Sequence, residues 1–154
     1  MEPIQIQSSA FTGQTSIPSQ YTCDGINISP PLSWSGIPAG TKSIALICDD
    51  PDAPSGDWVH WILFNIPPTV HSLKEGFSYH DKPSPEMVGG KNGRGQLEYT
   101  GPCPPSRTHR YFFKLFALDR ALALPEGCSK QELLNAMEGH MLAYGELVGL
   151  YRRK

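Results

Sequence analysis

The sequence predicts a mainly β protein, an antiparallel β-sandwich with few and short helices, and three observations support this prediction. Its apolar residues fall in short runs rich in β-branched and aromatic side chains. Long irregular segments separate these runs, and the chain holds 15 glycines and 15 prolines. Only one stretch shows helical spacing, which favours a sandwich over alternating strands and helices.

The predicted strands begin near the N-terminus. Residues 3–7 (PIQIQ) alternate between apolar and polar side chains, as a half-buried strand does. Residues 42–49 (KSIALICD) and 59–66 (VHWILFNI) are short apolar runs bounded by glycine and proline. Residues 109–118 (HRYFFKLFAL) have the same character. We therefore expect four strands before the helical stretch.

The helical stretch is predicted near residues 129–139. Ser129 and Glu132 have capping-box spacing, in which each side chain accepts a hydrogen bond from the other residue's backbone N–H. Apolar residues follow at helical spacing, namely Leu133, Leu134, Met137 and Met141. Gly139 is a plausible stop for the helix. Two later glycines would each cost a continued helix about 1 kcal/mol, so residues 142–152 are predicted as a final strand.

The totals restrict the function. At 154 residues the chain is the size of one domain, residues 1–154, with no repeat or linker. The net charge of −2 gives no general attraction to nucleic acid. The apolar runs are far shorter than a membrane span, so no stable membrane insertion is expected. The N-terminus lacks the pattern of a secretory signal, which favours a cytoplasmic location.

The four cysteines are widely spaced and form no CxxC pair. They are Cys23, Cys48, Cys103 and Cys128. This spacing argues against a structural zinc site, and no metal site is predicted. Without a secretory signal, free thiols are the default expectation. One disulfide is compatible with the sequence, and every pairing remains open.

The first polar cluster starts at Asp50, in the segment Asp50-Pro-Asp-Ala-Pro54. The prolines hold Asp50 and Asp52 on a stiff, extended backbone directly after a strand. An ordinary turn is the alternative interpretation, because Asp and Pro are common turn residues. Strand alternation then places Trp58 and His60 on one face, with Val59 and Trp61 on the opposite face. The first pair lines either a pocket or the core.

The second polar cluster is a loop rich in glycine and proline that leads into a strand. The loop runs from Gly101 to Pro105, and alternation then places His109 and Tyr111 on one face with Arg110 opposite. Such a loop followed by two polar aromatic residues is typical of the entrance to a binding site. The alternative is a loop followed by an ordinary core strand.

With both clusters in place, the chain resembles the phosphatidylethanolamine-binding protein family, also called Raf kinase inhibitor-like proteins. The matching residues are Tyr21-Thr-Cys-Asp-Gly25, Ser29-Pro-Pro-Leu-Ser-Trp34, Asp50-Pro-Asp-Ala-Pro54, Trp58 with His60, Gly101 through Pro105, and His109-Arg-Tyr111. Matches at Gly139-His140, Glu146-Leu-Val-Gly149 and Tyr151 resemble the bacterial and archaeal branch in particular. Together the matches run over nearly the whole chain.

The resemblance implies a Greek-key β-sandwich with a small pocket at one end that binds phosphate or a phosphorylated head group. It assigns Asp50, Trp58, His60, Gly101, Pro105, His109 and Tyr111 to this pocket, with Asp52 beside it. It further implies a homodimer and no cofactor. Two departures affect the expected ligand. Arg107 stands where the family usually has glycine, so a cation could sit at the rim, and residues 95–99 differ from the usual glycine-rich approach.

Two aspartates near an anion pocket require an explanation, because bare carboxylates repel phosphate. A carboxylate that is hydrogen-bonded to an imidazole favours the charged imidazolium. Asp50 paired with either His60 or His109 would therefore create hydrogen-bond donors for an anion. The Tyr111 hydroxyl and backbone N–H groups near Gly101 would add further donors. In this hypothesis the aspartates orient the donors and do not touch the ligand.

The sequence favours a non-enzymatic binding protein, with two alternatives. A phosphoester hydrolase could use His60, His109 and the aspartates as general acid and base, with the Cys103 thiol as a conceivable nucleophile. However, the chain contains neither a GxSxG elbow nor an HExxH pair. The other alternative is inhibition of a protein partner such as a kinase or a protease, which the resemblance implies without identifying the partner.

Overall fold

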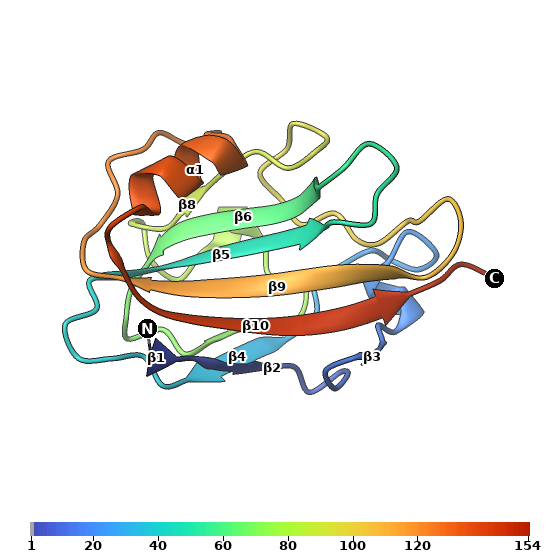
Figure 1. Ribbon diagram of the computed structural model, residues 1–154, viewed down its shortest axis with the longest axis horizontal. Helices are drawn as coiled ribbons and strands as arrows, with labels where there is room; N and C mark the ends of the chain where they lie inside the picture. The colour runs from blue at the N-terminus through green and yellow to red at the C-terminus, as the bar shows by residue number, and fades with distance from the viewer. Residues whose placement is uncertain (1) are drawn as a thin grey trace.

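The computed structural model describes residues 2–154 and contains two packed β-sheets (Figure 1). The larger sheet has the order β1-β10-β9-β5-β6-β8, and β3 pairs with the outer edge of β10. Its strands are β1 Glu2–Pro3, β3 Thr15–Ser16, β5 Ser43–Asp50, β6 Trp58–Ile66, β8 Val88–Gly89, β9 His109–Leu118 and β10 Met141–Tyr151. The smaller sheet contains β2 Gln5–Gln7, β4 Leu32–Ser35 and β7 Ser72–Leu73. The predicted mainly β fold is confirmed.

Four strands of the larger sheet form a Greek key. Strands β5, β6 and β8 occur in this order along the chain, with β7 of the smaller sheet between β6 and β8. They are neighbours in the larger sheet, and both neighbouring pairs are antiparallel. Strand β9 then returns by a long connection to pair antiparallel with β5. The fourth strand thus lies beside the first, which defines the motif.

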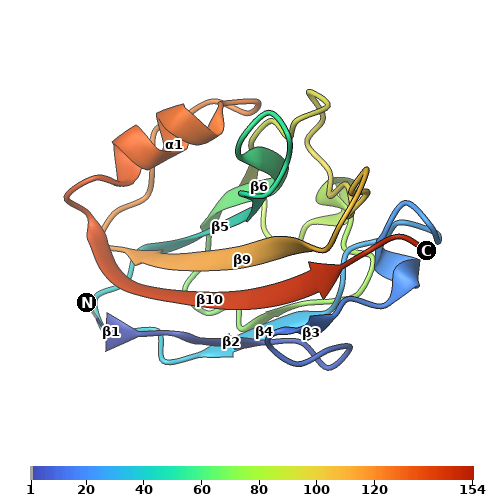
Figure 2. The same cartoon turned by 45° about the vertical axis from the view of Figure 1, so that its right-hand side comes forward.

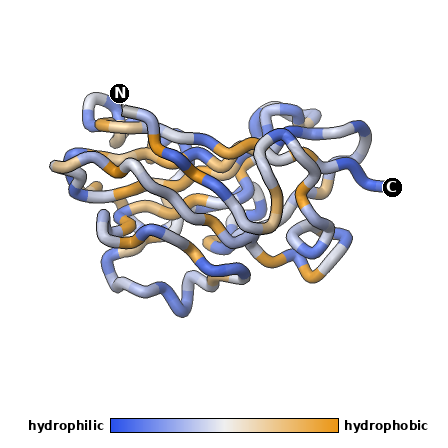
Figure 3. Tube along the Cα trace, turned by 90° about the horizontal axis from the view of Figure 1, so that it is seen from below, coloured by the Kyte–Doolittle hydropathy of each residue, from blue (hydrophilic) through white to orange (hydrophobic). Residues whose placement is uncertain are grey.

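The core has two layers. The first fills the space between the sheets and includes Leu32 and Trp34 of the smaller sheet with Leu46 and Phe113 of the larger one. The second lies between the other face of the larger sheet and helix α1, Lys130–Met137. Because β5 is covered on both faces, all eight of its residues are buried, which explains its nearly continuous apolar run. Figure 3 shows hydrophobic residues concentrated along the strands and hydrophilic residues in many loops.

The helix and the final strand agree with the sequence prediction. Ser129 caps α1 and forms the predicted capping box with Glu132, and Leu133 and Met137 are buried against the sheet. Strand β10 covers the region predicted as the last strand. Among residues 2–154, no helix combines the length and the apolar character that crossing a membrane requires.

The predicted strand at residues 3–7 is instead two strands in different sheets. Pro3 pairs with β10 in the larger sheet, whereas Gln5–Gln7 pairs with β4 in the smaller one. Ile4 lies at the crossing point and donates its N–H to the carbonyl oxygen of Tyr144 at 2.9 Å. Apolar alternation gives the face of a strand but not its partner, so the sequence could not indicate this change of sheet.

A β-bulge changes the predicted faces of β6. Its pairing register with β5 shifts between Cys48 and Asp49. Val59 packs into the core layer under α1, as alternation predicts for the face opposite His60. Trp61, however, packs into the layer between the sheets, together with Tyr111. The prediction for Trp61 was therefore wrong, because a bulge inserts a residue and breaks the two-residue period.

Three strand ends meet at one end of the larger sheet. Strand β5 ends at Asp50, and its two neighbours β6 and β9 begin at Trp58 and His109. Antiparallel neighbours start where the central strand stops, so these three residues come together although they are distant along the chain. Figure 2 brings this end of the molecule, with its long loops, toward the viewer.

Candidate functional site

A pocket of about 330 Å³ opens at this end of the sheet. Its lining consists of Asp50, Ala53, Pro54, Ser55, Trp58, His60, Arg94, Thr100, Gly101, Cys103, Pro104, Pro105, His109 and Tyr111. Seven of the eight residues assigned from the sequence are therefore brought together, and Asp52 lies outside the lining. The two polar clusters of the sequence form opposite parts of one cavity.

Asp50 is buried in the wall of the pocket and orients His109. Its Oδ2 atom lies 2.7 Å from Nδ1 of His109, and its Oδ1 atom accepts the backbone N–H of Asp52 at 2.7 Å. Both oxygens of the carboxylate are thus engaged by the protein. Because His109 uses Nδ1 toward Asp50, its Nε2 atom is the ring nitrogen left for a ligand. Of the two pairings considered from the sequence, the structure contains Asp50 with His109.

His60 is oriented by the backbone. Its Nδ1 atom lies 2.6 Å from the carbonyl oxygen of Thr100. A carbonyl oxygen only accepts, so Nδ1 carries the proton and Nε2 remains for a ligand. Burial lowers the pKa of His60, against the raising effects of this hydrogen bond and of the charge on Asp50. The free pocket therefore holds His60 mainly as a neutral imidazole near neutral pH.

Tyr111 contributes a buried hydroxyl to the pocket wall. Within residues 2–154 this hydroxyl has no hydrogen-bond partner, although the side chain is almost fully buried. Its ring packs edge-on against His60, with centroids 5.2 Å apart, and stacks near His109 at 6.4 Å. Burial, and next the negative charge on Asp50, raise the pKa of Tyr111. The hydroxyl therefore keeps its proton.

Asp52 makes a surface ion pair beside the pocket. Its carboxylate accepts hydrogen bonds from Nε, Nη2 and the backbone N–H of Arg110, each at 2.9 Å. The side-chain bonds from Arg110 are the largest cause that lowers the pKa of Asp52 to about 2. Arg110 thus points away from Tyr111 as strand alternation predicts. This pair anchors the start of β9 against the loop after β5.

Gly101 is positioned by a segment distant in sequence. Its N–H donates to Oδ1 of Asn27 at 2.8 Å, so this N–H is not the free donor that the sequence analysis expected near Gly101. A Cβ atom at this position would collide with the carbonyl oxygen of Tyr21. Only glycine therefore allows the loop to approach the segment around Tyr21 this closely.

A disulfide fixes the loop that forms the rim. Cys23 and Cys103 are bonded, with Cα atoms 5.4 Å apart and a separation of 80 positions in sequence. The default expectation of four free thiols is therefore wrong for this pair, because folding brings two distant loops together. The bond also removes the Cys103 thiol that was considered as a nucleophile. Cys48 and Cys128 are free and buried, and burial raises the pKa of both thiols.

The cation at the pocket is Arg94, which the sequence analysis missed. Arg107, the expected rim cation, is exposed and does not line the pocket. It has φ +61°, a left-handed conformation, which gives a physical reason for the family's glycine at this position. No pattern in the sequence connects Arg94 with the two polar clusters, so only the fold could place it here. No group of three or more metal-ligating side chains gathers within residues 2–154.

Comparisons with known proteins agree with the fold. The family model described as "Phosphatidylethanolamine-binding protein" matches residues 7–152. A UPF0098 protein of Methanothermobacter thermautotrophicus is 55% identical over 150 residues, which are 97% of this chain and 99% of the relative. A UPF0098 protein of Pyrococcus horikoshii is 49% identical, over 96% of this chain and 76% of that protein.

Two crystal structures have closely similar folds. One is described as a phosphatidylethanolamine-binding protein homologue from Chlamydia trachomatis and has a TM-score of 0.90 at 42% identity, covering 100% of both chains. The other is E. coli YbcL, described as a member of the mammalian family, with a TM-score of 0.90 at 32% identity over 98% of this chain and 99% of YbcL. Together with the family model, these relatives confirm the resemblance that the two polar clusters indicated. The chain belongs to the phosphatidylethanolamine-binding protein family and is similar to its bacterial and archaeal members.

Proposed function

We propose that the protein is a non-enzymatic binding protein whose pocket takes phosphate or a phosphorylated head group. The observation that carries this proposal is that Tyr111, a residue of the pocket lining, has a buried hydroxyl without a hydrogen-bond partner in the described chain. An unsatisfied buried hydroxyl costs about 1–3 kcal/mol. A ligand oxygen that accepts from Tyr111 would remove this cost.

The two histidines decide the charge of the ligand that fits. Nδ1 of each ring is held by the protein, and Nε2 of each is left to the pocket. Protonation of either imidazole turns its Nε2 into a charged donor, which forms the stronger class of hydrogen bond to an anion. Because His60 is mainly neutral in the empty pocket, anion binding should be accompanied by proton uptake.

This proposal gives a definite sign for the pH dependence. Anion affinity should fall as pH rises, because proton uptake by the imidazoles becomes harder. Sulfate is the best probe, since it stays a dianion over the range in which histidine titrates. Calorimetric titration of sulfate, phosphate and O-phosphorylethanolamine should show weaker sulfate binding at about pH 8 than at about pH 6.

The matched variant for this experiment is His109→Ala, which should abolish the binding of all three anions. Sulfate affinity that stays flat from about pH 5 to about pH 9 would remove imidazolium from the account. No binding of any of these anions by the unaltered protein would overturn the proposal.

Hydrolysis of phosphoesters is a second candidate function, favoured by one observation. The 2.7 Å contact between Asp50 and His109 is the arrangement that orients a general base. Incubation with phosphomonoesters and release of inorganic phosphate tests this candidate. We expect no turnover, whereas steady release that is lost in His109→Ala would favour the enzyme.

We further propose that the protein acts as a homodimer that regulates a protein partner such as a kinase or protease. We place it in the cytoplasm, although the Cys23–Cys103 disulfide is of a kind that is rare in that compartment. Light scattering in solution tests the dimer, and fractionation with thiol trapping tests the location. A pull-down compared between the unaltered protein and His109→Ala tests whether a partner depends on the pocket. Partner binding that does not change in this variant would place the partner surface elsewhere.

A further inference from the structure

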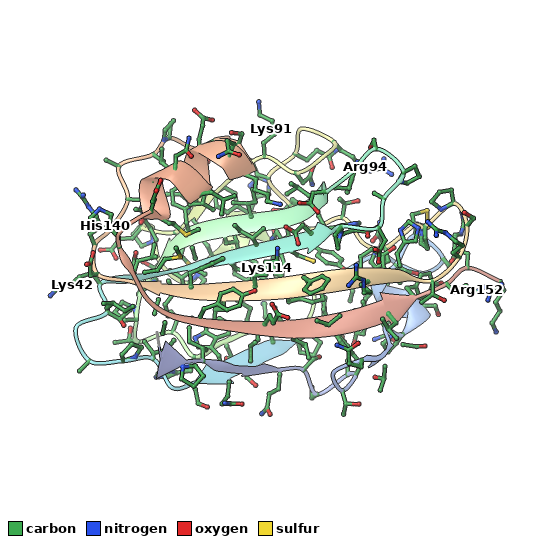
Figure 4. The ribbon with its side chains drawn as sticks, in the orientation of Figure 1. Lys42, Lys91, Arg94, Lys114, His140 and Arg152 are labelled. Carbon is green, nitrogen blue, oxygen red and sulfur yellow. A yellow bond between two sulfur atoms is a disulfide. The ribbon has the colours of Figure 1, made fainter. Side chains whose placement is uncertain are left out.

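Arg94 is a cation in the pocket wall, and no ion-pair partner is found for it within the described residues 2–154. It lines the same cavity as Asp50, His60 and Tyr111, and Figure 4 shows it beside the loop that joins β5 and β6. The salt bridges found within residues 2–154 do not include it. Arg110, by contrast, is bound to Asp52. The Arg94 guanidinium is therefore available to a ligand.

The turn that carries Arg94 is held by Asn92, which is only 4% exposed. The Asn92 side-chain oxygen accepts the backbone N–H groups of Arg94 at 2.8 Å and Gln96 at 3.0 Å. Its Nδ2 donates to the carbonyl oxygen of Glu98 at 2.7 Å. A side chain with three hydrogen bonds to the backbone keeps the turn in one conformation. The backbone position of Arg94 is thus set before any ligand arrives.

The same turn packs directly against the pocket wall. Gly93 donates its N–H to the carbonyl oxygen of Val59 at 2.8 Å. A Cβ atom on Gly93 would collide with the Trp58 ring, so the absence of a side chain lets the turn lie flat on this ring. The turn is therefore attached to β6, the strand that also carries His60.

Arg94 supplies the permanent positive charge of the pocket. The titratable or charged side chains in the lining are Asp50, His60, Arg94, His109 and Tyr111. A proton on His109 would only balance the charge of Asp50, and Tyr111 is neutral. Burial, with a smaller contribution from the charge on Arg94, lowers the pKa of His60. A guanidinium stays charged at every pH of interest, so Arg94 is the lining side chain whose positive charge does not depend on pH.

We propose that Arg94 makes the pocket selective for phosphomonoester dianions over phosphodiester monoanions. A monoester presents three terminal oxygens and two charges, and a diester presents two terminal oxygens and one charge. A planar guanidinium binds two phosphate oxygens at once. In a dianion, one terminal oxygen then remains for Tyr111 and the histidines. This inference rests on the anion pocket proposed above and names the ligand class of that pocket.

Methyl phosphate and dimethyl phosphate are the probes that separate the two ligand classes. At about pH 7.5 the monoester is mainly a dianion, whereas the diester is a monoanion of similar size. The unaltered protein should bind methyl phosphate at least about tenfold more tightly than dimethyl phosphate. In Arg94→Gln, methyl phosphate affinity should fall about tenfold and dimethyl phosphate affinity by only about threefold, since an exposed cation is partly screened.

Two further variants complete the design. Arg107→Gln removes another exposed arginine outside the pocket and should bind both probes like the unaltered protein. Arg94→Lys keeps the charge without the planar fork and should retain part of the preference. Unfolding curves of all variants establish that the fold is intact.

The outcomes distinguish this inference from the proposed function. If the unaltered protein does not bind methyl phosphate, the anion pocket itself is wrong. If it binds both probes equally well, or if Arg94→Gln behaves like Arg107→Gln, the pocket stands and the role of Arg94 is overturned. An equal loss for both probes in Arg94→Gln would also overturn selectivity by charge.

Discussion

The Nδ1 atom of His109 lies 2.7 Å from Oδ2 of Asp50, and both side chains are almost fully buried. This contact joins the end of β5 to the start of β9, two positions 59 residues apart. In the proposed anion pocket, the acid holds an imidazole whose Nε2 is left for the ligand, which gives the buried carboxylate a role there.

Replacing Asp50 by asparagine should weaken sulfate binding at about pH 6 by about tenfold, because a neutral amide supports an imidazolium less well. The pH at which binding is lost should also move to a more acidic value. Calorimetry across pH measures both effects. Asp57→Asn is the control, since Asp57 is exposed and its charge interacts with Lys130. Tighter binding in Asp50→Asn would mean that Asp50 mainly repels the anion.

Replacing Tyr111 by phenylalanine should separate binding from stability. The hydroxyl has no protein partner in the described chain, so its removal should leave the free energy of unfolding unchanged or raise it by up to about 1 kcal/mol. Sulfate affinity should fall severalfold. Tyr99→Phe is the matched control. Its hydroxyl donates to the carbonyl oxygen of Tyr21 at 2.8 Å, so this variant should lose about 1 kcal/mol of stability and keep its affinity.

The stability of the ligand-free protein should fall on the acid side of histidine titration. Burial lowers the pKa of His60 in the folded state, so the unfolded chain takes up this proton more readily. The contribution of His60 is therefore fully present above the unfolded-state value of about 6.5 and is lost as pH falls below it. Urea unfolding at several pH values measures the slope.

The variant His60→Gln should reduce this slope, whereas His80→Gln, at an exposed position, should not. If the slope of stability against pH near pH 6 persists in His60→Gln, the slope comes from a titratable group other than His60.

The Asp52–Arg110 pair affects stability in a different pH range. The pKa of Asp52 is lowered to about 2, so its contribution is lost only below the ordinary Asp value of about 4.

Replacing Arg107 by glycine should stabilise the protein. A left-handed conformation costs a residue with a Cβ roughly 1–2 kcal/mol, and the extra freedom of glycine in the unfolded chain offsets about half of this. We expect a gain of about 0.5–1 kcal/mol in urea unfolding. The neighbouring Ser106→Gly, which lacks a positive φ, should lose stability by a similar amount. An equal effect of both changes would contradict the backbone explanation.

The disulfide should be detectable by counting thiols. Denatured, unreduced protein should show two reactive thiols, from Cys48 and Cys128, and four after reduction. Four thiols without reduction would mean that the bond does not form in the preparation. The double substitution of Cys23 and Cys103 by serine should cost about 2–4 kcal/mol of stability, because the bond closes a long loop. It should also weaken sulfate binding, since Cys103 lies in the rim of the pocket.

The sequence determined the elements whose signals are local. The capping box at Ser129 and the apolar runs of β5, β6, β9 and β10 depend on neighbouring residues, and they appear in the structure close to where they were predicted. The two polar clusters were also visible, because their residues follow one another or alternate along a strand. The family matches then linked the clusters across the chain.

Tertiary structure decided the relationships between distant residues. Pairing of Asp50 with His109 and not His60, the Cys23–Cys103 bond and the arrival of Arg94 at the pocket all depend on how separate loops meet. The bulge in β6 and the change of sheet after Pro3 depend on strand pairing. Side-chain periodicity reports which face a residue occupies on its own strand. It carries no information on which strand or loop packs against that face, and that packing fixed the chemistry of this pocket.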